Sequence, residues 1–158
     1  MAGYIKFEGL DGEALDKGHK GWSDIMSFSQ ALTKPGSGTG ATRRRGDVIL
    51  EDLMVVKEID KATPKLAEAI CKGRVFATVQ IEVTASFTDA GRVTFYRVEL
   101  KNAQVASYSF DGAVQADEVP METVCLNFEE IKVTYTECDT TGKTKGNIEY
   151  TWKVEEGE

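Results

Sequence analysis

Few side chains in this sequence could do chemistry, and they do not form a known constellation. His19 is the only histidine, and it shares a loop with Glu13 and Asp16, which could orient it as a general base. A nucleophile is missing, because Ser27 and Ser29 lack the GxSxG turn that exposes a catalytic serine. A transition metal would need a second histidine or a nearby cysteine. We therefore expect no enzyme activity, no cofactor and no metal, and a turn or hydrogen-bonding role for His19.

The three cysteines give no redox or metal signal. Cys71, Cys125 and Cys138 are an odd number at wide spacings, without a CxxC pair. Cys125 stands between Val124 and Leu126 and is expected to be a small buried hydrophobe.

Residues 32–46, LTKPGSGTGATRRRG, form the one low-complexity stretch, and we expect a flexible extended loop. Its glycines do not end in the Gly-Lys-Ser/Thr of a phosphate-binding loop. On an acidic protein, three consecutive arginines in such a loop favour a solvated or protein-contacting cluster over binding to nucleic acid.

Composition predicts one soluble domain spanning residues 1–158, because 158 residues with 41% hydrophobic content suffice for a single core. The net charge of -7 disfavours nucleic acid as a partner. No apolar run is long enough to insert into a membrane, and the N-terminus lacks the pattern of a signal peptide, so synthesis should be cytoplasmic.

The elements that must position these residues are mostly strands. Residues 4–10, 22–30, 52–58, 74–87, 92–110, 121–138 and 147–154 alternate in polarity or carry β-favouring residues, with bends expected near 102–103 and 129–130. In the second strand, Met26 and Phe28 are expected to enter the core, which places Ser27 and Ser29 on the opposite, wetter face.

One short helix is expected after the strand 52–58. Thr63 should cap its N-terminus, Pro64 suits its first turn, and Gly73 suits the position after its end. Leu66 and Ile70 share one face and should pack on the sheet. The predicted fold is therefore mainly β: a small antiparallel β-barrel with one short α-helix packed against it.

Three segments resemble the haemolysin co-regulated protein (Hcp) family of bacterial type VI secretion. They are DKATPKL at 60–66, His19 to Trp22 followed by Ser27 to Ser29, and ETVCLNF at 122–128, which is the most specific. The motif residues are His19, Asp60, Lys61, Thr63, Pro64, Leu66, Glu122, Leu126, Asn127 and Phe128.

The resemblance implies a structural tube subunit: hexameric rings that stack head to tail inside a sheath, associate with spike and baseplate proteins, carry effectors in the lumen and are exported from the bacterial cytoplasm. It implies that the loop 32–46 reaches a neighbouring subunit, and we expect its arginines to contact an acidic edge of that subunit. The candidate inter-subunit residues are Pro35, Gly36, Gly38, Gly40, Arg43, Arg44 and Arg45. Ser29 matches a lumen position, Ser27 should face the same way, and Gln30 departs from the aromatic residue of many members. We expect no C-terminal effector extension.

Two alternatives are a phage-like tail-tube protein and a monomeric barrel that binds a small apolar ligand. The DKATPKL and ETVCLNF segments favour Hcp over the tail-tube protein. The sequence does not identify the cargo, the organism or the target cell.

Overall fold

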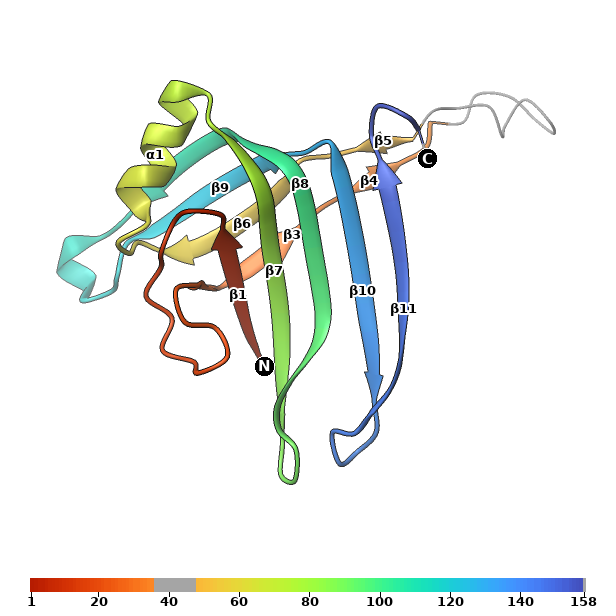
Figure 1. The fold of residues 1–158 in the computed structure, drawn as a ribbon. Coiled ribbons are helices and arrows are strands. Elements are labelled where there is room, and N and C mark those ends of the chain that lie inside the picture. Colours follow the sequence, from red (N-terminus) through yellow and green to blue (C-terminus); the bar gives the residue numbers. More distant parts are fainter. Residues whose placement is uncertain (36–47, 158) are drawn as a thin grey trace.

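The computed structural model describes residues 1–35 and 48–157 (Figure 1). Its strands are β1 Ala2–Phe7, β2 Ser23–Ile25, β3 Ser27–Ser29, β4 Leu32–Thr33, β5 Ile49–Leu50, β6 Leu53–Glu58, β7 Val75–Phe87, β8 Gly91–Asp111, β9 Met121–Asn127, β10 Glu130–Cys138 and β11 Thr144–Lys153. The helix α1 spans Thr63–Lys72, and a 3-10 turn spans Val114–Ala116. Within these residues, no helix is long and apolar enough to cross a membrane.

Strand β8 is the centre of one antiparallel nine-stranded sheet. Strand β7 pairs with one edge of β8, while β10 and β9 pair with successive halves of the other edge. The two halves meet at Asn102, whose φ of 51° lies in the left-handed region that asparagine tolerates. The bend expected near 102–103 is thus confirmed. The bend expected near 129–130 is a complete break between β9 and β10.

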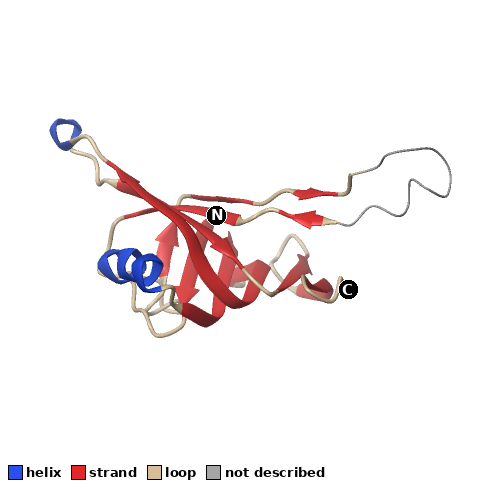
Figure 2. Cartoon of the chain, turned by 90° about the horizontal axis from the view of Figure 1, so that it is seen from above, coloured by secondary structure: helices blue, strands red, loops and turns tan. Residues whose placement is uncertain are grey.

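The sheet curls back on itself, and the two strands at the ends of its path, β2 and β3, are neighbours in the sequence. The path of paired strands runs β2-β1-β7-β8-β9-β6-β3, and only Met26 separates β2 from β3. The Met26 N–H donates to the carbonyl oxygen of Val56 at 2.8 Å, which joins this segment to β6. Figure 2 shows the resulting curl. The mainly β fold with one helix is confirmed, and its main sheet is antiparallel and curled.

The break at Met26 overturns one expectation about the core. Met26 is 63% exposed and Phe28 is 36% exposed, so neither is a core residue, whereas Ile25 is buried. The change of strand at Met26 reverses the alternation, and Ser27 and Ser29 are exposed as expected.

Helix α1 packs on the sheet as predicted, at one end of the curl (Figure 1). Leu66 is fully buried, and Gly73 ends the helix with a φ of 64°. The predicted N-cap is wrong: Ala62 occupies that position, and the Thr63 hydroxyl instead donates to a carboxylate from another strand.

Candidate functional site

Two of the sequence motifs meet at a buried lysine. The Lys57 ammonium on β6 is completely buried, and it lies 2.5 Å from Glu122 Oε1 on β9 and 3.0 Å from Asp60 Oδ1 in the turn before α1. Asp60 belongs to the DKATPKL segment and Glu122 to the ETVCLNF segment. Segments 62 residues apart in the chain therefore share one ion-pair cluster, and the carboxylates of the two motifs have a structural role.

Hydroxyl groups complete this cluster. Tyr108 on β8 donates to Glu122 Oε2 at 2.6 Å, Thr63 donates to Glu122 Oε1 at 3.0 Å, and Ser23 on β2 donates to Asp60 Oδ2 at 2.7 Å. Burial and the neighbouring Glu122 carboxylate raise the pKa of Tyr108 well above its ordinary value. The cluster ties β2, β6, β8, β9 and the start of α1 together.

Sequence reasoning missed Lys57 and Tyr108. The alternation of β6 contains a signal for Lys57, because Leu53, Val55 and Lys57 lie on one buried face. A lysine at a position reserved for apolar residues indicates a carboxylate partner inside the protein.

The other motif residues divide between core and surface. Leu66 and Leu126 are fully buried, and Phe128 packs partly on the core. Asn127, Lys61 and Pro64 are exposed.

His19 is buried between two carboxylates, and it has the hydrogen-bonding role that its sequence context predicts. Its Nδ1 lies 2.6 Å from Asp16 Oδ2, and its Nε2 lies 2.6 Å from Glu82 Oε2 on β7. The ring stacks on Tyr4 with centroids 4.1 Å apart. The His19 hydrogen bond lowers the pKa of Asp16, and Arg92, whose Nη1 is 2.8 Å from Asp16 Oδ1, lowers it further. This contact fastens the loop between β1 and β2 to the sheet.

Ser27 and Ser29 belong to two rows of uncharged side chains on the outward face of β3, β6, β9 and β8. Directly paired residues form each row: Ser27, Val56, Thr123 and Ser109 in one, Ser29, Met54, Cys125 and Ser107 in the other. All are exposed or half-buried. We call this surface the uncharged rows. Cys125 was expected in the core, but it lies half-buried in the second row.

The outward face has a different character on β7, β10, β11 and the first half of β8. Gln80, Glu99, Lys132 and Thr151 are paired across β7, β8, β10 and β11, and two of these four residues are charged.

Only one of the predicted loop residues can be placed. Pro35 is exposed just after β4. Gly36, Gly38, Gly40, Arg43, Arg44 and Arg45 lie outside the described residues. The loop 32–46 begins on a ribbon of β4 and β5, which extends away from the curled sheet (Figure 2). The apolar Leu32 and Ile49 on this ribbon are 52% and 50% exposed.

A curled antiparallel sheet with one packed helix, which carries the uncharged rows on part of its outward face, defines a mainly β protein. The family model described as "Type VI secretion system effector, Hcp" matches residues 4–135, so the chain belongs to the Hcp family and is a type VI secretion tube protein.

The relatives agree with this assignment. The chain is 29% identical over 153 residues to Protein hcp1 of Pseudomonas aeruginosa, covering 96% of this chain and 93% of that protein. A solved type six secretion system protein superposes with a TM-score of 0.91 at 28% identity, covering 99% and 98% of the two chains. Hcp1 from Salmonella typhimurium shares the fold, with a TM-score of 0.77 at 21% identity and coverage of 98% and 95%.

We expect Lys57→Met to lower the free energy of unfolding by about 3 to 5 kcal/mol, because it leaves Glu122 buried without its cation. Lys132→Met is the matched control: its exposed pair with Glu149 spans 3.5 Å, so its loss should stay below about 1 kcal/mol. Urea unfolding measures both. Adding Glu122→Gln to Lys57→Met should restore part of the stability, and equal losses in the two single variants would contradict the role of the cluster.

The His19–Asp16 contact predicts an effect of acid. Because the pKa of Asp16 is lower in the folded than in the unfolded protein, its stabilisation is complete above the unfolded value and is lost as pH falls through the folded value. Between about pH 5 and pH 2, Asp16→Asn should therefore lose less stability than the wild type. Urea midpoints across this range test it, with the exposed Glu51→Gln as control. If Asp16→Asn lost as much stability as the wild type over this pH range, the expectation would be refuted.

Proposed function

We propose that this protein forms hexameric rings, that the rings stack head to tail into the inner tube of a type VI secretion system, and that the uncharged rows line the lumen and contact effectors. Its partners would be copies of itself, effectors in the lumen, and the sheath, spike and baseplate proteins. Export would take it from the bacterial cytoplasm to the medium or a target cell. Its role would be mechanical, without catalysis.

The composition of the uncharged rows is the observation that carries this proposal. Charged residues make up 28% of the sequence, yet neither row contains one. Ser27, Ser29, Ser107 and Ser109 are short and polar, so they would leave a passage wide and bind any one cargo weakly. A wall without fixed charge suits the transport of effectors of either sign.

Other exposed features support contacts between copies. Among the described strands, β11 pairs only with β10, so its second edge offers unpaired backbone groups. Ile148 on β11 is 75% exposed. We expect ring closure within one layer to be the stronger association, and stacking to be weaker and salt-sensitive if Arg43 to Arg45 take part.

The first test is the native mass. Light scattering on a sizing column should give a mass near six times the 17.3 kDa of one chain, and negative-stain images of that peak should show annular particles. A monomer that persists at high concentration would overturn the proposal and favour an isolated ligand-binding barrel. Stacked tubes that survive where single rings dissociate would reverse the expected order of the two contacts.

Spin labels can test which face lines the lumen. In a background with Cys71, Cys125 and Cys138 replaced by serine, a label on Ser29→Cys should give short distances between subunits, because lumen residues lie nearest the ring axis. A label on Lys132→Cys, which lies on β10 and outside the uncharged rows, should give longer distances. Pulsed electron spin resonance measures both. Longer distances from Ser29→Cys would place the uncharged rows on the outside.

A further inference from the structure

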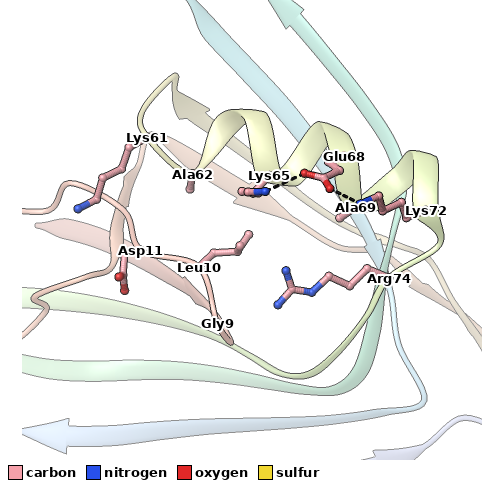
Figure 3. A pocket seen from close by; sticks show the side chains of 10 residues that line it. All are labelled: Gly9, Leu10, Asp11, Lys61, Ala62, Lys65, Glu68, Ala69, Lys72 and Arg74. Atoms are coloured by element: carbon pink, nitrogen blue, oxygen red, sulfur yellow. Dashed lines mark hydrogen bonds and ion pairs between the residues drawn. The ribbon is translucent and has the colours of Figure 1, made fainter.

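A basic pocket lies between α1 and the loop that follows β1 (Figure 3). It has a volume of about 340 Å³, and four cationic side chains line it against two carboxylates. These residues are Lys61, Lys65, Lys72 and Arg74, with Asp11 and Glu68. The excess of positive charge is unusual for a chain whose net charge is -7.

The two carboxylates are already occupied. Glu68 accepts hydrogen bonds from both Lys65, at 3.0 Å, and Lys72, and these bonds lower its pKa to about 2. Asp11 accepts a hydrogen bond from Lys6 at 3.0 Å. In the described part of the chain, neither Lys61 nor Arg74 forms an ion pair with a carboxylate, although the charge of Lys61 helps Lys6 to lower the pKa of Asp11. The pocket thus holds two cations that are open to an outside anion.

Arg74 is held in place for such a contact. Its guanidinium lies 4.6 Å from the centroid of the Phe76 ring and donates one hydrogen bond, at 3.1 Å, to the carbonyl oxygen of Glu8. Gly9 makes the room, because a Cβ at this position would come within 2.8 Å of Arg74 Nη2. A guanidinium fixed by stacking keeps further N–H donors available and loses little freedom on binding.

The apolar lining of the pocket distinguishes between anions. Leu10, Ala62 and Ala69 line it beneath the basic side chains, and all three are buried in the fold. A free phosphate ion would gain nothing from this apolar surface, whereas a peptide could place an apolar side chain on it and carboxylates beside the cations.

We propose that this pocket binds an acidic segment of a partner protein, with an apolar side chain on Leu10, Ala62 and Ala69 and carboxylates paired with Lys61 and Arg74. The interaction goes beyond ring and tube formation and does not depend on them. Because the rest of the protein is acidic, the pocket is where an acidic partner meets the least repulsion.

A fluorescein-labelled peptide of four glutamates around one leucine tests the proposal by fluorescence anisotropy on the full chain. Lys61→Gln/Arg74→Gln should weaken binding about tenfold, from about threefold for each cation removed. The variant Lys61→Gln/Lys65→Gln leaves Arg74 in place and should also weaken peptide binding. It keeps the test valid if the first variant fails to fold. Lys143→Gln/Lys145→Gln, at the exposed β10–β11 turn, removes the same charge and should bind normally.

The remaining outcomes decide against the proposal. Absent binding would overturn the proposal, and equal weakening in the turn variant would show that net charge alone drives the binding. Equal binding of a peptide with serine in place of leucine, together with displacement by inorganic phosphate at constant ionic strength, would make this a simple anion site. A fall in native mass on adding the peptide would mean that the pocket is already a contact between copies of this chain.

Discussion

The buried ammonium of Lys57 is the constraint on which the arrangement of strands and helix depends. A charge removed from water costs several kcal/mol unless hydrogen-bonded counter-charges surround it. Here Glu122 and Asp60 supply the charge, and the carbonyl oxygen of Glu58 accepts a third bond at 2.8 Å. Lys57 lies directly opposite Glu122 in the β6–β9 pair. A slip of one residue would turn Lys57 toward the other face, so the ion pair fixes the register.

The same register sets which side chains form the uncharged rows. Antiparallel strands usually turn apolar residues inward and charged residues outward. Along β6 and β9 the paired charges Lys57 and Glu122 point inward, which leaves their neighbours Val56 and Thr123 on the outside. The buried cluster and the uncharged rows are thus two faces of one pairing pattern, and the cluster gives the outer surface a rigid backing.

The sequence predicts most of what depends on local signals. The strands, the helix with Pro64 and Gly73 at its ends, and the bend at Asn102 follow from alternation and backbone preference. The failures involve residues whose partners are distant: Thr63 donates to Glu122 rather than capping its helix, and Met26 is exposed because the strand breaks there. The Lys57 cluster was missed for the same reason: the alternation of β6 marks Lys57 as inward, but no local pattern identifies Glu122, 65 residues further along the chain, as its partner.

The contacts that would hold such an assembly together differ in their dependence on charge from those that would select its partners. Copies with a net charge of -7 repel one another, but salt limits this repulsion to roughly 8 Å at physiological ionic strength. Strand edges and exposed apolar side chains such as Ile148 act only at contact, so they can hold copies together despite the repulsion. A basic pocket acts earlier, on the approach of an acidic partner. Ring closure would then depend little on charge, while recognition beside α1 would depend on it strongly.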